Sequence, residues 1–166
     1  MDYPREDHDE AHELARQQTG FWGRRGAGGI VYARSTGRYL LQLRSDTVLQ
    51  GGTWGVWGGA VDEGHGPEDC VRLEILQETG YRDRLDLHFI VDFVDVSTGF
   101  RYSNYLAVVE EEFTPILNWE GKDFGWFEGG EWPEPLHFGL RYLLGHAPDP
   151  AAIASSKAGV VISSAP

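Results

Sequence analysis

The sequence predicts a single α/β domain. Several segments are rich in Val, Ile, Leu and aromatic residues and are bounded by glycines, as strands are. Others have apolar residues at helical spacing, and one of these falls among the strands while another follows them. With 166 residues, of which 41% are hydrophobic, the chain is long enough to bury the core of one domain.

The first part of the chain is predicted to form a helix and a hairpin. Residues 4–18 contain many helix formers and few apolar positions, which indicates a mostly solvated helix that ends at Gly20. Residues 26–34 and 38–44 have strand character, and a Ser-Thr-Gly sequence between them predicts a short turn. Residues 50–59 are rich in glycine and tryptophan, and we expect a loop there.

The strongest helix signal lies at residues 67–79. Pro67 suits a first helical turn, and Glu68 and Asp69 complement the positive end of the helix dipole. Gly80 suits the position at which a helix ends. The apolar residues have helical spacing: Val71, Ile75 and Leu76. A helix over residues 67–79 is therefore expected.

The second half of the chain is predicted to add three strands and a last helix. Residues 85–96 are apolar on both faces, which predicts a central strand. Residues 101–110 and 124–127 have the character of further strands, and residues 136–144 that of a helix. An apolar patch at residues 160–162, within an Ala- and Ser-rich end, belongs either to a tail or to a strand added at a sheet edge.

Charge and composition exclude several classes of function. A net charge of −12 argues against binding of a long nucleic acid, whose phosphates require Lys and Arg. Apolar runs do not approach the roughly 20 residues that span a bilayer, and the first residues are acidic where a signal peptide is basic. Cys70 is the single cysteine, which excludes a disulfide framework. We expect a cytoplasmic protein without a membrane partner, in which a metal ion helps any binding of phosphates.

One helical segment carries residues suited to metal chemistry. Glu74, Gln77 and Glu78 are spaced i, i+3 and i+4, so they project from one face of the expected helix. Mg²⁺ favours one or two protein carboxylates and leaves room for water and substrate phosphates. By itself this spacing also fits a solvated helix face.

The flanking residues resemble the Nudix box. That pattern reads Gly, five residues, Glu, seven residues and then Arg-Glu-aliphatic-x-Glu-Glu-x-Gly-aliphatic. The matching residues are Gly59, Glu74, Ile75, Glu78 and Gly80. The resemblance extends over residues 22–145 and implies a Nudix-type α/β/α sandwich with a mixed, curved sheet between helices. It divides the chain into an N-terminal helical extension (1–20), a Nudix domain (21–146) and a C-terminal tail (147–166).

Four positions depart from the box. His65 stands where the family has its first Glu, Leu73 where it has Arg, Gln77 where it has the first of the paired Glu, and Tyr81 where it has an aliphatic residue. In the family that arginine orients the glutamates. Arg72 lies one position early, about 100° around the helix, so it is not expected to replace the missing arginine.

The resemblance implies a pyrophosphohydrolase that uses Mg²⁺ or Mn²⁺. Water attacks the diphosphate of a small nucleoside diphosphate derivative, such as a nucleotide sugar, a dinucleoside polyphosphate or a nucleoside triphosphate. Carried over position by position, the metal ligands are Glu74, Glu78, the carbonyl oxygen of Gly58 and the amide oxygen of Gln77. The general base in this family often comes from outside the box, and Glu120 and His137 are both candidates.

Other residues are candidates for binding the nucleotide. Arg44 suits phosphate oxygens, and Trp57 and Tyr105 suit stacking on a base. His65 is either a proton carrier or phosphate donor, or an exposed loop residue. The departures from the box favour a rival, a catalytically weak or inactive Nudix domain that binds a nucleotide or another protein. A homodimer is a further expectation, because dimers are common in the family.

Overall fold

The computed structural model describes residues 25–155, and two helices and seven strands lie wholly within this range. The elements, in chain order, are β1 (Arg25–Ala33), β2 (Arg38–Arg44), β3 (Trp54–Gly55), β4 (Trp57–Ala60), α2 (Pro67–Thr79), β5 (Asp86–Asp95), β6 (Phe100–Val109), β7 (Gly121–Glu128) and α3 (Phe138–His146). Within the described range, neither helix is both long and apolar enough to cross a membrane. The helix expected at residues 4–18 and the apolar patch at 160–162 lie outside the described residues.

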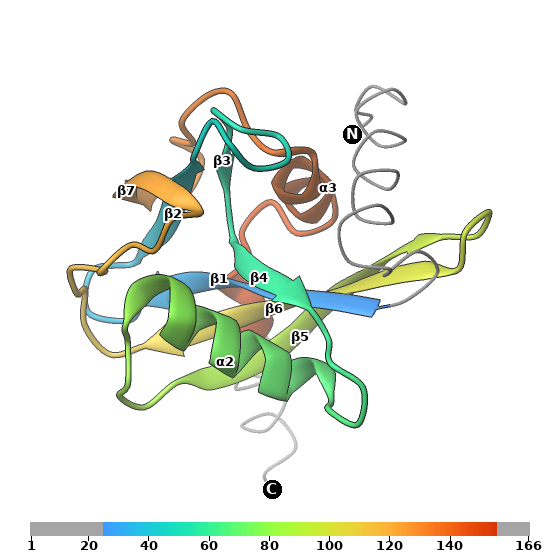
Figure 1. Cartoon of the computed structure of the whole chain (residues 1–166). Helices are drawn as coiled ribbons and strands as arrows, with labels where there is room; N and C mark the ends of the chain where they lie inside the picture. The colour runs from blue at the N-terminus through green and yellow to red at the C-terminus, as the bar shows by residue number, and fades with distance from the viewer. Residues whose placement is uncertain (1–24, 156–166) are drawn as a thin grey trace, which may run out of the picture.

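The strands form one mixed sheet with β1 at its centre (Figure 1). The main path runs β3-β2-β1-β6-β5, while β4 pairs with β1 and β7 pairs with β2. The β1 and β6 strands are parallel, and the other pairs are antiparallel. Both β4 and β2 pair with β1, so the end of β2 lies close to β4. Because β7 pairs with β2, the start of β7 lies there too.

Each face of the sheet is covered by a helix, as expected for an α/β/α sandwich. On one face Val71 and Ile75 of α2 pack against a buried cluster that includes Val31 and Leu40. On the other face the buried leucines of α3 pack against residues of β1, β2 and β6: Leu140, Leu143 and Leu144. The prediction of a mixed sheet between helices is therefore confirmed.

The α2 helix begins and ends at the predicted residues. Pro67 occupies its first turn after Gly66, and Glu68 and Asp69 lie near its positive end. Gly80 has φ 77° and donates its backbone N–H to the Leu76 carbonyl oxygen at 2.8 Å. Because a left-handed conformation suits glycine, this residue ends the helix at the place the sequence indicates.

Two predictions about the strands are wrong. The segment 85–96 is expected in the centre of the sheet, but β5 pairs only with β6 among the described strands. It is apolar on both faces because Leu87 packs on the α2 side and Ile90 on the α3 side. Residues 50–59 are expected to form a loop, yet they contribute β3 and most of β4, in which Gly58 lies against the backbone of Ala27 and Gly28 of β1.

The first residues after α3 pack on the domain. Tyr39 is fully buried, and its hydroxyl donates to Asp149 Oδ1 at 2.9 Å. The same hydroxyl accepts the backbone N–H of Ala151 at 3.0 Å. These contacts fix residues 149–151 against the face of the sheet that α3 covers.

Candidate active site

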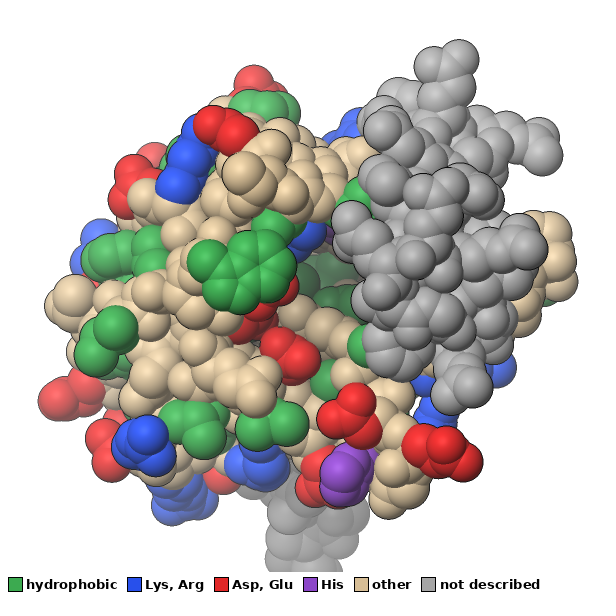
Figure 2. Space-filling model, viewed as in Figure 1, with side chains coloured by type: hydrophobic (Ala, Val, Ile, Leu, Met, Phe, Trp, Pro, Cys, Tyr) green, Lys and Arg blue, Asp and Glu red, His purple; other side chains and the backbone are tan. Residues whose placement is uncertain are grey.

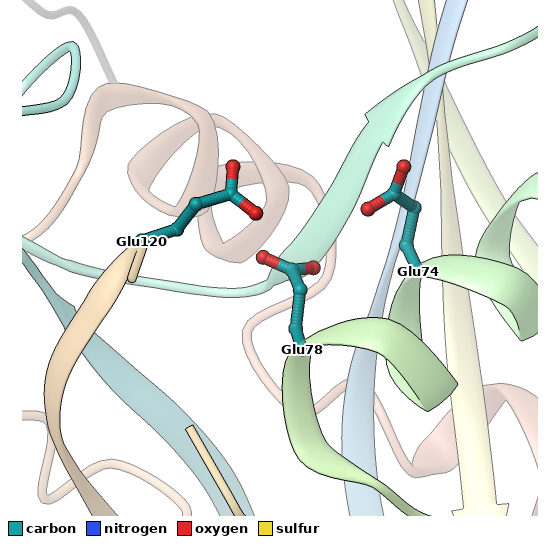
Figure 3. A group of neighbouring side chains, drawn as sticks. All are labelled: Glu74, Glu78 and Glu120. Carbon is teal, nitrogen blue, oxygen red and sulfur yellow. The ribbon is translucent and has the colours of Figure 1, made fainter. Parts of the chain in front are cut away.

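Three carboxylates converge at one edge of the sheet (Figure 3). Glu74 and Glu78 extend from α2, and Glu120 extends from the residue before β7. One oxygen of each side chain lies within 4.8 Å of the corresponding oxygens of the other two. The i, i+4 spacing on α2 places Glu74 and Glu78 side by side, and the pairing of β7 with β2 brings Glu120 to them.

Glu78 is held by two hydrogen bonds that use both carboxylate oxygens. The backbone N–H of Gly58 donates to Oε1 at 2.8 Å, and Nε2 of Gln42 donates to Oε2 at 3.2 Å. Gln42 is 1% exposed, and its Nε2 also donates to the Val56 carbonyl oxygen at 3.3 Å. These donors from β2 and β4 fix the orientation of a buried side chain on α2.

Glu74 packs on the backbone of β4. A Cβ atom at Gly59 would lie 2.5 Å from Oε1 of Glu74, so a larger residue at this position would displace the carboxylate. The glycine pair at 58–59 therefore has two roles, since one residue donates to Glu78 and the other leaves space for Glu74.

The backbone around Glu120 is fixed by reciprocal hydrogen bonds with Asn118. Asn118 Nδ2 donates to Glu120 Oε2 at 3.2 Å, and the Glu120 N–H donates to Asn118 Oδ1 at 3.0 Å. The Glu120 carbonyl oxygen accepts the N–H of Ser45 at 2.9 Å, which ties this segment to the end of β2. Its carboxylate is thus positioned by contacts local to the loop and to β2.

The convergence of acids makes ionisation unfavourable. Burial, together with the charges of Glu120 and Asp62, raises the pKa of Glu74 to about 7. Burial, with the charges of Glu120 and Glu74, raises the pKa of Glu78 to about 8, against its hydrogen bonds from Gln42 and Gly58. Both groups therefore retain their protons to a higher pH than an ordinary glutamate, unless a cation replaces the protons.

The donor set fits a hard divalent cation. Three carboxylate groups within 4.8 Å supply the oxygen ligands that Mg²⁺ and Mn²⁺ prefer. The raised pKa values of Glu74 and Glu78 mean that the surrounding protein does not fully compensate the negative charge of these carboxylates. Glu74, Glu78 and Glu120 are thus suited to hold such an ion.

Arg44 lies beside this cluster at the end of β2. Its Nε donates to the Leu49 carbonyl oxygen at 2.8 Å. Burial lowers the pKa of Arg44, while the charges of Glu78 and Glu120 favour its charged form. An arginine is effectively always protonated, so a guanidinium stands next to the acids, where a phosphate would bind.

His137 caps the N-terminus of α3. Its Nδ1 accepts the N–H of Gly139 at 2.9 Å, and its ring stacks on Phe138. Burial lowers the pKa of His137 to about 3, with further contributions from Arg44 and Arg141. The ring is therefore neutral at pH 7 and carries its proton on Nε2, because Nδ1 is an acceptor.

Other predicted site residues lie elsewhere. Trp57 is 0% exposed, and its Nε1 donates to the Leu40 carbonyl oxygen at 3.0 Å, so its ring is a core residue. Tyr105 is also buried, on the α2 side of the sheet. His65 and Gln77 are exposed, and Leu73 is 42% exposed. The structure thus brings together Glu74, Glu78, Glu120 and Arg44, and it places Trp57 and Tyr105 in the core.

Sequence reasoning missed Gln42 and Asn118, which position the acids. Gln42 is the central polar residue of an otherwise apolar strand segment, Leu40–Leu43. A buried polar residue in such a segment requires partners, which is a signal for a site. Asn118 gave no comparable signal, because Asn in a loop is common.

Comparisons with known proteins agree with this arrangement. A sequence profile described as the NUDIX domain matches residues 23–144. The chain is 33% identical over 130 residues to a Mycobacterium tuberculosis protein named "Putative 8-oxo-dGTP diphosphatase 3"; the match covers 72% of this chain and 60% of that protein. The chain thus spans less than two thirds of that relative's length.

Solved structures with the same fold include two informative relatives. A MutT NUDIX hydrolase from Burkholderia pseudomallei is 28% identical with a TM-score of 0.58, and the match covers 74% of this chain and 96% of that one. The NUDIX domain of Shewanella oneidensis NrtR, solved with ADP ribose, is 21% identical with a TM-score of 0.57, and the match covers 83% and 96%. The profile match and the sequence relative together establish that this chain belongs to the Nudix family.

Proposed function

We propose that the protein is a metal-dependent hydrolase of the diphosphate linkage in a small nucleoside diphosphate derivative. The observation that carries this proposal is the convergence of Glu74, Glu78 and Glu120 within 4.8 Å. A bound Mg²⁺ or Mn²⁺ would neutralise charge on the diphosphate and lower the pKa of a water molecule. Glu74 and Glu78 would hold the ion, and the Gly58 carbonyl and Gln77 remain further candidate ligands.

We assign the proton transfer to Glu120 in preference to His137. Glu120 Oε2 accepts from Asn118, which leaves Oε1 free to take a proton from the attacking water. His137 uses Nδ1 as the acceptor of its helix cap, and its Nε2 carries a proton. It is therefore suited to donate a hydrogen bond, and a base needs a free lone pair.

Arg44 would bind the phosphate chain beside the cation. Its Nε is committed to Leu49, so its two terminal nitrogens are the ones that would donate to phosphate oxygens. One guanidinium and a divalent cation then balance the three carboxylates of the assembled site, so the anionic substrate does not meet their uncompensated charge.

The substrate class is tested first with nucleoside triphosphates. The name of the Mycobacterium relative makes 8-oxo-dGTP, with dGTP as its control, the leading pair in the panel. ADP-ribose, a nucleotide sugar and a dinucleoside tetraphosphate complete it. Purified protein with Mg²⁺ or Mn²⁺ should release a nucleoside monophosphate from at least one compound. A folded sample that turns over none of them overturns the proposal.

A second candidate, a binding module without catalysis, is favoured by one observation. Three of the four box positions that depart from the family are exposed and do not face the acids, namely His65, Leu73 and Gln77. The NrtR domain shows that this fold can hold ADP ribose, so ADP ribose is a suitable probe. Calorimetry separates the two functions: a compound that binds without metal and is recovered intact after incubation with Mg²⁺ favours the binding module.

A further inference from the structure

Tyr102 of β6 lies in a slot that glycines create. In the parallel pairing of β1 with β6, Gly26 is opposite Tyr102. A Cβ at Gly26 would lie 2.8 Å from Cδ2 of the Tyr102 ring, and Cβ atoms at Gly28 and Gly58 would overlap its hydroxyl. The ring therefore runs along β1 toward β4, and three residues without side chains are needed to admit it.

The hydroxyl end of the ring reaches the strand that positions the acids. Gly58 faces the Tyr102 hydroxyl, and its backbone N–H donates to Glu78 at 2.8 Å. Gly59, the next residue, adjoins the Glu74 carboxylate. The Tyr102 hydroxyl and the Glu78 carboxylate thus adjoin the same residue of β4, Gly58, and Glu74 adjoins the next one. Figure 2 shows acidic side chains beside a hollow in this face of the molecule, with hydrophobic side chains deeper within it.

The Tyr102 hydroxyl has no hydrogen-bond partner among residues 25–155. Three other tyrosines of the described range have one, whereas Tyr32 and Tyr105 resemble Tyr102: Tyr39 bonds to Asp149, Tyr142 to the Asp92 carbonyl oxygen and Tyr81 to the Arg84 carbonyl oxygen. A phenol without a partner loses a hydrogen bond that water would give it, so such a group in a half-buried position indicates a ligand or a water.

The electrostatic setting makes this hydroxyl a donor. Burial raises the pKa of Tyr102 far above its ordinary value, and the charges of Glu78 and Glu74 raise it further while Arg44 opposes them. The phenol remains neutral, so it presents an O–H close to acidic groups without adding negative charge. An anionic oxygen that arrives with a cation is a suitable acceptor for it.

We propose that the Tyr102 hydroxyl donates a hydrogen bond to a phosphate oxygen of the bound nucleotide, on the side of β4 opposite α2. This inference rests on the proposed function, and it adds a substrate contact that lies outside the box. Tyr102 and Arg44 then bind the phosphate chain together, the first with a neutral donor and the second with a charged one. The glycines at 26, 28 and 58 are needed to place the hydroxyl there.

The test compares Tyr102→Phe with Tyr32→Phe by calorimetry. Tyr32 lies on β1 and packs on Tyr39, so its variant is a matched loss of one phenol. The probes, each with Mg²⁺, are an α,β-methylene nucleoside triphosphate and inorganic pyrophosphate. Tyr102→Phe should weaken both by about tenfold or more, as expected for a hydrogen bond to a charged group. Tyr32→Phe should change neither probe, and both variants should bind Mg²⁺ alone like the wild type.

The outcomes separate this inference from the proposed function. Unchanged affinity for both probes in a folded Tyr102→Phe variant overturns the proposed phosphate contact. A loss of affinity for the nucleoside triphosphate analogue alone also overturns it, because the hydroxyl would then contact the nucleoside. Wild-type binding of the analogue without turnover of any substrate overturns the hydrolase proposal alone, since the contact is still measured by affinity. Wild-type protein that binds neither probe overturns this inference, and the turnover panel then decides the hydrolase proposal.

Discussion

Two acidic sites of this protein, one at the half-buried Glu112 and one at the buried Glu78, are built in opposite ways. Glu112 accepts hydrogen bonds from Thr36 at 2.6 Å and from Arg38 Nε and Nη2 at 2.7 and 2.8 Å. Burial raises the pKa of Glu112, but these hydrogen bonds outweigh burial, and the net pKa is lowered. Glu78 accepts from an amide and a backbone N–H and faces two further acids, and its pKa is raised to about 8.

The difference distinguishes a carboxylate that serves the fold from one that serves a ligand. Glu112 has its cation within the chain, in a fork geometry that satisfies both oxygens. Glu78 is oriented by neutral donors, which hold its position without neutralising its charge. A carboxylate that is held in position while its charge is left without a cation is typical of a functional site. Such a site lowers the stability of the fold and is stabilised when its ligand binds.

The largest effect is expected from exchanging each acid for its amide. Glu78→Gln should lower kcat/KM by at least about 100-fold, because a ligand to the cation is lost. It should also raise the melting temperature of the metal-free protein at pH 8, because a repulsive charge is removed. Glu112→Gln should leave kcat/KM within twofold of the wild type. It should slightly lower the melting temperature, since exposed ion pairs contribute at most about 1 kcal/mol to stability. Equal activity losses in the two variants would contradict the comparison.

The next effect concerns pH. Raised pKa values at Glu74 and Glu78 mean that the folded, metal-free protein binds more protons than the unfolded chain between their ordinary value of 4.5 and about 8. Stability from these groups therefore falls as pH rises through that window. We expect the metal-free melting temperature to fall from pH 6 to pH 8.5, relative to Glu78→Gln, and the stabilisation by Mg²⁺ to grow. A melting curve that has the same pH dependence in both proteins would contradict this.

A smaller effect is expected from the residues that orient the acids. Gln42→Met removes the donor to Glu78 Oε2 while keeping the volume, and it should weaken Mg²⁺ binding by about tenfold. Gln77→Met tests the candidate ligand on the exposed face of α2, and because that side chain is exposed we expect Mg²⁺ affinity to change by less than twofold. Isothermal titration measures both. A larger loss at Gln77 would make its amide oxygen a ligand to the ion.

The smallest effect is expected at His137. His137→Asn keeps a side-chain acceptor at the cap of α3, so kcat/KM should stay within about threefold of the wild type and its pH profile should not change. His137→Ala should destabilise the fold by about 1 kcal/mol through loss of the cap. A large loss of kcat with disappearance of a pH limb in His137→Asn would assign the base to this residue in place of Glu120.

Local sequence signals predicted α2 accurately and the sheet only in part. The helix begins with a proline and two acidic residues and ends at a glycine, and each of these residues is typical of its position. The place of β5 depends on which strands pair, and apolar residues on both faces report only that helices cover both faces. The glycines of β4 indicate a turn in isolation, and only their contacts with β1, Tyr102 and Glu74 explain them.

Some residues of the candidate site could likewise be predicted from local sequence, and others could not. Glu74 and Glu78 follow from helical spacing, and their convergence with Glu120 required the pairing of β7 with β2. Trp57 stands beside the paired glycines in sequence, but strand alternation turns its ring into the core. The slot for Tyr102 combines glycines of two strands with a ring from a third, so it is visible only in three dimensions.

The central claim is that Glu74 and Glu78, which lie beside Glu120, hold a divalent cation in place of protons. It is tested most directly by calorimetric titration of the metal-free protein with Mg²⁺ at pH 7.5, in buffers of different ionisation enthalpy. We predict binding at one site with net release of protons, because Glu74 and Glu78 must ionise. Glu78→Gln should abolish that binding and Glu112→Gln should preserve it. Binding without proton release, or binding that persists unchanged in Glu78→Gln, would contradict the claim.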